Sequence, residues 1–223
     1  MQDQAMGVAL PERKRQPLLA LLALIPLAAC SPYADAERDV AAGGRGLAKL
    51  NPSPQQGYEL VLTLKDAPGP FAVVEGVAQY DVSNHKDCGR VLRATGTASR
   101  ITSQELVTLR KVGENEYRGT FYLDRMQDED YYGRGVCHWA LTGVGAMLRA
   151  TTGEADTRFL TFIDKERMDA GSRVTRHYPR ADYPRIEEII GYGASGEEDP
   201  SSYRADLRDA LFSTTTTVQK LAP

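Results

Sequence analysis

Three cysteines are the side chains of this 223-residue chain best suited to covalent chemistry. The first, Cys30, follows an apolar run at 17–27, which three basic residues at 13–15 precede. A basic cluster, a short apolar run and small residues before a processing point are typical of an export signal. The run of about 11 residues would span roughly 16 Å as a helix, whereas the hydrocarbon core of a bilayer is about 30 Å thick. We therefore expect a cleaved signal rather than a membrane span.

The residues Leu27-Ala28-Ala29-Cys30 resemble the lipobox of bacterial lipoproteins. The resemblance implies that residues 1–29 are removed, that the thiol of Cys30 is diacylated, and that the new amino terminus is acylated. Acyl chains anchor a protein because each buried CH₂ group contributes about 0.8 kcal/mol. These chains are the only non-protein groups expected.

Ser31 resembles the residue that follows the cysteine in lipoproteins sorted to the outer membrane. The expected location is therefore the outer membrane of a Gram-negative bacterium, facing the periplasm. An ordinary secretory signal with an incidental cysteine is the alternative.

Cys88 and Cys137 remain once Cys30 is acylated, and an isolated pair in an exported chain usually forms a disulfide. The closed loop of about 50 residues predicts roughly 4 kcal/mol of stabilisation from lost chain entropy. A metal or redox pair is the alternative. However, the chain has no Cys-x-x-Cys, and only His138 stands near either thiol.

The three histidines, His85, His138 and His177, lack the spacing of a metal or catalytic motif. The sequence also has no nucleophile elbow, phosphate-binding loop or dinucleotide fingerprint. Gly143-Val144-Gly145 is expected as a turn between strands. We therefore assign no catalytic or metal-ligating residue and expect a protein that is not an enzyme. A serine that meets His138 or His177 and a carboxylate in space would favour the opposite interpretation.

An acidic and aromatic segment at 124–139 holds the candidates for contact with a partner. It does not fit the EF-hand calcium pattern, because Gly133 is misplaced and no glutamate closes the loop. Tyrosine, tryptophan and arginine are enriched at the binding hot spots of interfaces. The candidate partner-binding residues are Asp124, Asp128, Asp130, Tyr131, Tyr132 and Arg134. The alternatives are a solvated turn, or tyrosines that cover the end of the domain.

The elements that must position these residues show a period of two rather than 3.6. Strands are predicted at 58–65, 71–80, 106–109, 117–123, 136–141, 146–151, 157–163 and 174–178. The third and fourth of these are expected to form a hairpin around 113–115. About eight short strands separated by turn residues predict a mainly β fold, either an antiparallel sandwich or a barrel-like domain.

Two segments of different composition flank the predicted β domain at 58–180. Residues 30–57 are rich in alanine, glycine, proline, serine and glutamine, which predicts a flexible tether. A short helix around 36–42 is the alternative.

On the other side, residues 181–223 are expected to be an extension with one or two short helices, at 186–190 and 202–212. The threonine-rich stretch 213–218 is either a terminal strand or a frayed tail.

The charge of the chain is modest. Without residues 1–29, 24 lysines and arginines stand against 28 aspartates and glutamates, a net charge of −4. This balance indicates neither a nucleic-acid partner nor a basic lipid-binding surface.

These features predict a non-enzymatic, membrane-anchored module that binds a protein. In build, the chain resembles the lipoprotein immunity proteins and inhibitors that accompany bacterial toxins and cell-wall hydrolases. The resemblance implies that a loop with aromatic anchors fills a cleft of the partner and excludes its substrate. The alternatives are a structural or assembly lipoprotein of the cell envelope or of a secretion system, and an enzyme.

Overall fold

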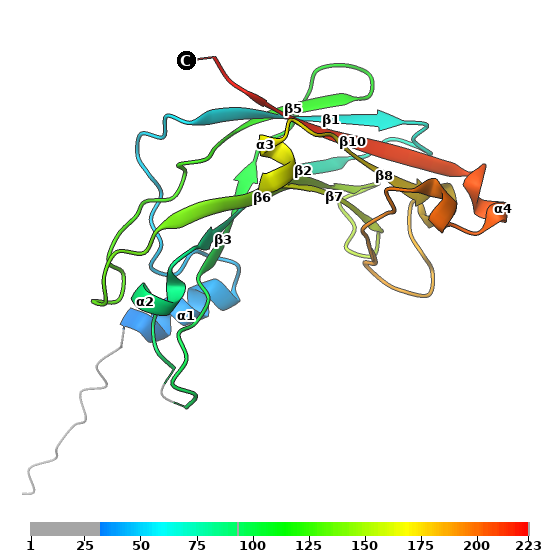
Figure 1. The fold of residues 1–223 in the computed structure, drawn as a ribbon. Coiled ribbons are helices and arrows are strands. Elements are labelled where there is room, and N and C mark those ends of the chain that lie inside the picture. Colours follow the sequence, from blue (N-terminus) through cyan, green and yellow to red (C-terminus); the bar gives the residue numbers. More distant parts are fainter. Residues whose placement is uncertain (1–31, 93, 223) are drawn as a thin grey trace, which may run out of the picture. The chain divides into compact units, whose positions relative to one another are not determined.

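The computed structural model describes residues 32–92 and 94–222 (Figure 1). The expected signal at 1–29 and the acylation site Cys30 lie outside these residues. From Pro32 onward the chain forms one compact unit. Within the described ranges, no helix has the length and apolar character needed to cross a bilayer.

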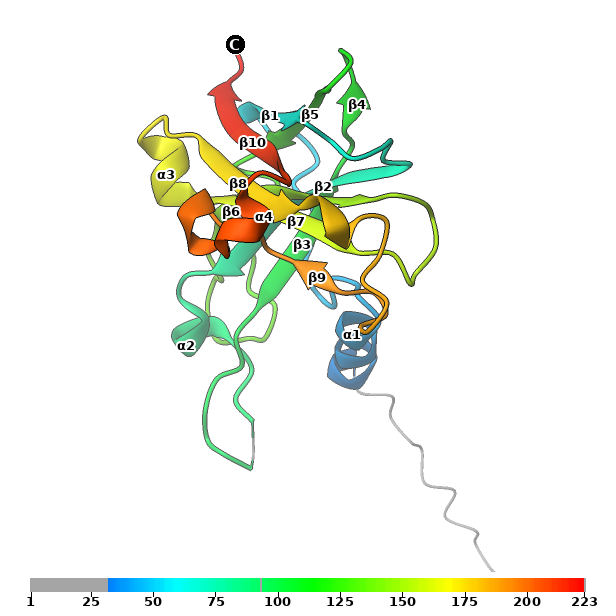
Figure 2. The ribbon, with the colours of Figure 1, turned by 90° about the vertical axis from the view of Figure 1, so that its right-hand side faces the viewer.

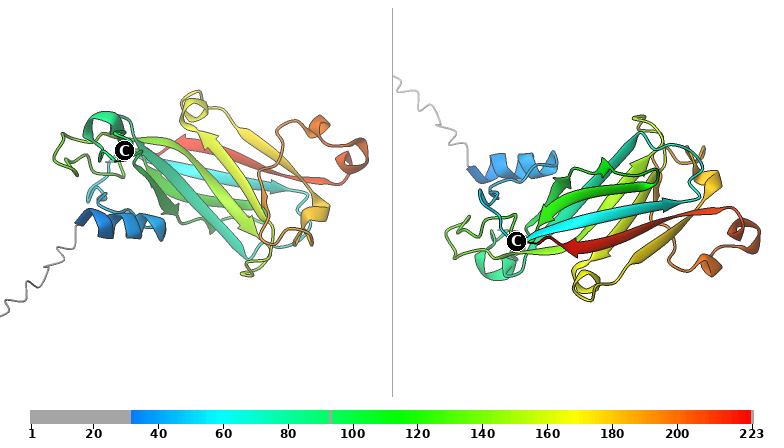
Figure 3. Two further views of the ribbon diagram at one scale, coloured as in Figure 1. Left: turned by 90° about the horizontal axis from the view of Figure 1, so that it is seen from below. Right: turned by 90° about the horizontal axis from the view of Figure 1, so that it is seen from above.

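Two five-stranded sheets pack face to face as a β-sandwich (Figures 1 and 3). The first sheet has the strand order β4-β5-β1-β10-β8 and is antiparallel throughout. Its strands are β1 (Gly57–Lys65), β4 (Arg110–Lys111), β5 (Glu116–Tyr122), β8 (Val174–Pro179) and β10 (Leu211–Lys220).

The second sheet has the order β3-β2-β6-β7-β9 and is antiparallel except for the pair β7 and β9. Its strands are β2 (Val73–Val82), β3 (Thr102–Val107), β6 (Trp139–Arg149), β7 (Arg158–Asp164) and β9 (Gly193–Ala194). The predicted β-sandwich is thus confirmed, and the described strands do not close into a barrel.

One short helix precedes the strands, and further short helices and turns connect them. They are α1 (Pro32–Ala41), α2 (His85–Cys88), α3 (Lys165–Asp169) and α4 (Ala205–Arg208), with the 3₁₀ turns η1 (Arg180–Asp182) and η2 (Pro200–Ser202).

The core lies between the sheets and follows the alternation seen in the sequence of β1. Leu60 and Leu62 are fully buried, and Leu64 is nearly so. Leu60 belongs to the same cluster as Val144 of the other sheet, and Leu62 to that of Phe159. Burying side chains of this size contributes about 1.5–3 kcal/mol each, so the central strands are a main source of stability.

The expected turn at Gly143-Val144-Gly145 is wrong, because these residues lie in the middle of β6. The predicted strands 136–141 and 146–151 therefore belong largely to one strand. A Cβ atom on Gly145 would lie 2.1 Å from the carbonyl oxygen of Thr161 on β7. The glycines thus permit a close approach of neighbouring strands and do not turn the chain.

The expected hairpin between 106–109 and 117–123 is also only partly present. The turn at 113–115 exists, but β5 pairs with the two-residue strand β4. Residues 102–107 form β3, which pairs with β2 in the opposite sheet. The chain therefore crosses from one sheet to the other between Val107 and Arg110.

The C-terminal residues complete the sandwich instead of extending it. β10 lies between β1 and β8, and Phe212, Thr214 and Thr216 are at most 1% exposed. In place of the predicted helix at 202–212 the chain forms η2, α4 and the start of β10. Residues 186–190 contain turns and a bend but no helix.

The threonine-rich residues form a strand because β-branched side chains favour strands. Their hydroxyl groups also have hydrogen-bond partners within the chain. The hydroxyl of Thr216 lies 2.8 Å from that of Thr161 on the facing sheet. On the other face of β10, Thr175 and Thr215 form a second hydroxyl pair, at 3.0 Å.

The described part of the expected tether, residues 32–57, differs from a flexible spacer. It begins with α1 and continues as a segment whose backbone pairs with the loop 123–127. Arg45 forms a bidentate ion pair with Glu105 of β3, with N···O distances of 2.7 and 3.0 Å. The composition of this segment predicted flexibility. It could not indicate the ordered course, because the residues that hold the segment in place are remote in the sequence.

Candidate binding surfaces

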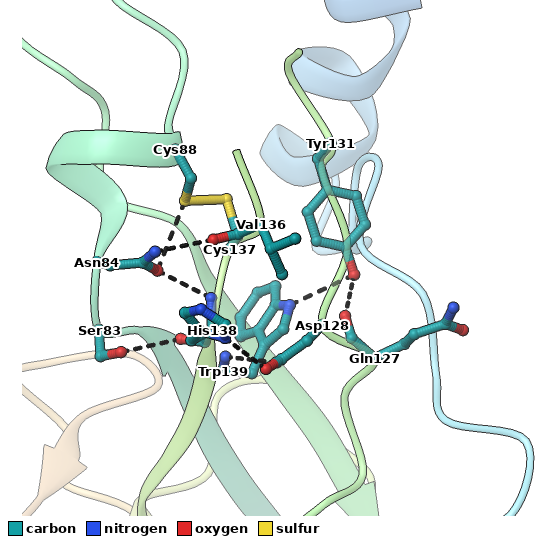
Figure 4. A network of polar contacts seen from close by, with 10 residues as sticks. All are labelled: Ser83, Asn84, Cys88, Gln127, Asp128, Tyr131, Val136, Cys137, His138 and Trp139. Carbon is teal, nitrogen blue, oxygen red and sulfur yellow. Dashed lines mark hydrogen bonds and ion pairs between the residues drawn. A yellow bond between two sulfur atoms is a disulfide. The ribbon is translucent and has the colours of Figure 1, made fainter. Parts of the chain in front are cut away.

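The disulfide predicted from the cysteine count is confirmed. Cys88 at the end of α2 is bonded to Cys137, just before β6, with a Cα–Cα distance of 5.3 Å (Figure 4). Both cysteines are buried. The bond joins the loop 83–101 to the loop 123–138, and together with α1 we call these segments the disulfide-tied end.

Polar contacts of Asn84 reinforce this covalent link (Figure 4). Its side chain donates to the carbonyl of Val136 and accepts from the N–H of His138, both at 2.8 Å. The backbone N–H of Ser83 donates to the carbonyl of His138 at 2.9 Å. The two loops are therefore fixed to each other at several points.

Each of the three candidate aspartates holds backbone groups of its own chain. Asp124 accepts from the N–H groups of Gln55 and Gln56, at 2.8 and 2.9 Å. Asp128 accepts from the N–H of Trp139 at 2.9 Å and lies 2.7 Å from His138 Nδ1.

Asp130 closes a tight turn. Its carboxylate accepts from the N–H of Arg134 at 3.0 Å. Partial desolvation raises the pKa of Asp130, but hydrogen bonds from the backbone of residues 132–135 outweigh it and hold this pKa below its usual value.

Tyr131 and Tyr132 lie over the end of the sandwich, which is one of the alternatives predicted from the sequence. The Tyr131 hydroxyl donates to the carbonyl of Gln127, and Trp139 Nε1 approaches it at 3.4 Å. The ring of Tyr132 stacks on that of Tyr33 in α1 at 5.7 Å between centroids, and burial raises the pKa of its phenol.

Arg134 donates to the carbonyl of Gly89. All six candidate residues thus make contacts within the chain. Partner binding by this segment stays a prediction.

The histidines lie on separate elements: His85 in α2, His138 before β6 and His177 in β8. Within residues 32–92 and 94–222, no three His, Cys, Asp or Glu side chains gather as metal ligands would. His138 points outward, opposite buried Cys137. Its imidazole pairs with Asp128, and no serine or threonine hydroxyl of the described chain hydrogen-bonds to that ring.

A groove that the sequence analysis missed opens between the edges of the two sheets. It has a volume of about 540 Å³ and lies between β3 and the pair β4-β5. Its floor includes the buried side chains of Val107 and Phe121. Its rim carries Leu106 and Val112, which are 73% and 57% exposed. We call this cleft the edge groove.

The cause of this exposure is an inverted alternation in β3. Ser103 and Glu105 point inward, whereas Leu106 points outward. Burying a carboxylate and exposing a leucine is the reverse of the ordinary pattern. This inversion is the signal in the sequence that could have indicated the groove.

The charges that line the edge groove leave it with an excess of arginine. Glu105 is paired with Arg45, and Glu59 with Arg118 at 2.9 Å. Arg110 and Arg125 also line the groove. Within the described ranges, neither has an ion-pair partner.

No protein-family model, curated protein or solved structure matches this chain.

Proposed function

We propose that this chain is an exported, lipid-anchored module that binds a protein partner through the edge groove. The lipobox-like sequence that ends at Cys30 supports the anchor. The Cys88–Cys137 disulfide supports an oxidising compartment, because such bonds persist outside the reducing cytosol.

The observation that carries the binding role is Leu106, exposed on an unpaired strand edge. In the described chain β3 pairs with β2 on one side only. Its other edge offers backbone N–H and C=O groups, which are a template for an added strand. Leu106 and Val112 are both exposed at the groove beside this edge, and exposed apolar side chains that adjoin one another mark interaction sites.

The chemistry of the groove defines the partner segment that it fits. An extended segment can add its backbone to β3 and place an apolar side chain against Leu106 and Val112. Carboxylates on the same segment would meet Arg110 and Arg125. The occupant is therefore an extended, apolar and acidic stretch of another protein.

A partner held in this way would stay close to the membrane and be covered on one side by the sandwich. In the immunity or inhibitor class, that partner is a toxin or a cell-wall hydrolase, and the bulk of the sandwich blocks its substrate. In the alternative role, the partner is a resident component of the envelope or of a secretion system. The identity of the bound protein separates these roles.

The test is capture from the native envelope by the full chain and by two charge variants. Leu106→Glu adds a carboxylate to the edge groove, whereas Ile190→Glu adds one at an aliphatic side chain that is 80% exposed elsewhere. We expect the full chain to capture one protein, which mass spectrometry identifies. The captured amount of this protein should fall at least tenfold with Leu106→Glu and stay unchanged with Ile190→Glu. Equal capture by all three chains, or capture of no protein, would contradict the proposal.

A further inference from the structure

We propose that the disulfide-tied end of the sandwich lies directly on the lipid surface, with Val91 and Leu92 in the headgroup layer. This inference rests on the proposed acylation of Cys30 and goes beyond it. An anchor alone fixes a distance from the membrane, whereas this proposal fixes which face of the domain meets the membrane.

The first argument is the length of chain between the proposed anchor and the folded domain. Cys30 is two residues before Pro32, where α1 begins. Two residues span at most about 7 Å. A flexible tether of 30–57 would have let the domain move freely, but the ordered course of residues 32–56 leaves only this short connection.

The second argument is that α1 is fixed to the sandwich rather than loosely attached. Glu37 pairs with Arg90 of the loop 83–101. The Arg90 guanidinium also lies over the ring of Tyr33, 5.6 Å from its centroid, and that ring stacks on Tyr132. Any force that holds the start of α1 at the membrane therefore holds this end of the sandwich there.

The third argument is the exposed aliphatic surface at this end. Ten large hydrophobic side chains of the described residues are exposed, and four of them belong to the disulfide-tied end. They are Val40 (51%), Val91 (40%), Leu92 (38%) and Val136 (45%). Exposed aliphatic side chains on segments close to a lipid anchor fit the boundary between headgroups and acyl chains.

The loop that carries two of them has the form of a projecting hairpin. Val91 bridges Ala98, and the N–H of Leu92 donates to the carbonyl of Thr97 at 2.9 Å. In Figure 2 this loop extends from the sandwich on the same side as α1 and α2. The apolar pair therefore belongs to a hairpin that projects from this end of the sandwich.

Two arginines at the base of the hairpin are paired within the chain: Arg90 with Glu37, and Arg100 with Asp81 at 3.1 Å. The contribution that Val91 and Leu92 make to lipid contact is apolar, so it persists when salt screens charges.

The test compares two positions in the acylated full chain bound to vesicles. Leu92→Cys and Ile190→Cys each introduce one free thiol at an exposed aliphatic position, and an environment-sensitive dye is attached to it. The loop between β8 and β9, which contains Ile190, lies at the opposite end of the sandwich in Figures 1 and 3. The vesicles are phosphatidylethanolamine and phosphatidylglycerol with a nitroxide-labelled lipid as quencher.

We expect nitroxide quenching at position 92 to be at least three times that at position 190, at both about 0.1 and 0.5 M salt. Inserting a 20-residue Gly-Ser spacer after Ser31 adds about 25 Å of reach. This variant should still sediment with the vesicles, while quenching at position 92 falls at least twofold.

Two negative results have different meanings. If the acylated chain sediments with vesicles but both dyes are quenched equally, the orientation proposed here is wrong and the anchor stands. If mass spectrometry finds no acyl group on Cys30 and the chain does not sediment, the anchor is wrong and the orientation falls with it.

Discussion

Glu105 shows how a single residue connects three parts of this molecule. Its carboxylate accepts from Arg45 Nε and Nη2, and from the Ser103 hydroxyl at 2.8 Å. Arg45 belongs to the segment that follows α1, whereas Glu105 lines the edge groove. The ion pair therefore attaches the N-terminal segment to the strand that we propose as the binding edge.

Arg45→Ala should lower the free energy of unfolding by about 2 kcal/mol, because a nearly buried carboxylate loses its charged partner. The loss is smaller than for a fully buried pair, since the Arg45 side chain is 42% exposed. Urea denaturation of the full chain measures it. Arg38→Ala, which removes an exposed pair with Asp35, should change stability by less than about 0.5 kcal/mol. Equal effects of the two substitutions would show that Glu105 does not depend on Arg45.

Asp156 gives a pH-dependent contribution of known sign. Hydrogen bonds from the hydroxyl and the N–H of Thr151, at 2.6 and 2.8 Å, hold the pKa of Asp156 below its usual value. Its contribution is therefore present above the unfolded pKa of about 3.9 and is lost as pH falls through the lower folded pKa.

We expect Asp156→Asn to be less stable than the parent chain by a constant amount between about pH 6 and 8, and the difference to shrink below about pH 4. Urea titrations at each pH check this. Asp169→Asn, which removes an exposed carboxylate that pairs with Lys165, is the matched control. A difference that persists unchanged at about pH 2 would contradict the assignment.

At the scale of the element, β10 is the strand on which the first sheet depends. It pairs with β1 over eight residues and with β8 over six. Phe212 packs against Phe159 and Tyr178 of the core, with centroids 5.0 and 5.1 Å away. The strand is therefore part of the sandwich interior.

Phe212→Ala should destabilise the chain by about 3–5 kcal/mol, because it removes a buried aromatic ring and leaves a cavity. Ile190→Ala removes an exposed aliphatic side chain and should cost less than about 0.5 kcal/mol. Thermal and urea unfolding of both variants provide the comparison. A small effect of Phe212→Ala would mean that β10 contributes little to the interior of the sandwich.

The elements that could be predicted are those whose pattern is local. The buried leucines of β1 were predicted correctly from the alternation of apolar and polar residues, because this pattern depends only on neighbouring residues. β10 was predicted only as one of two alternatives, a terminal strand or a frayed tail at 213–218, because threonine hydroxyls such as that of Thr216 count as polar until their partners across the sandwich are known. Gly145 was predicted to lie in a turn. The neighbouring strand that approaches it closely is remote in the sequence, so the local pattern could not indicate it.

The same distinction applies to the candidate sites. The disulfide followed from the count of cysteines and the expected compartment. The edge groove did not, because its walls come from strands of different sheets, and the inverted placement of Glu105 and Leu106 has meaning only once β3 is known to be an edge. The role of the aromatic segment in binding a partner stays a prediction, and its tyrosines are partly buried by α1 and Trp139.

At the scale of the whole molecule, the sandwich separates two proposed contacts. The disulfide-tied end carries α1 and the exposed aliphatic hairpin, while the edge groove runs along the side between the sheets. One contact sets the orientation on the membrane, and the other receives the partner. A rigid sandwich between them would present the groove at a fixed height above the lipid.

The pairing of β1 with β10 also governs when this chain can fold. Leu64 of β1 pairs with Thr214, about 150 residues later, and such non-local pairing makes folding slow, in milliseconds to seconds. Until β10 arrives, β8 has no partner in the first sheet and β1 is paired on one side only, so this sheet stays incomplete. A chain that must pass through a membrane channel before folding would remain competent for translocation for that time, without any separate device to delay it.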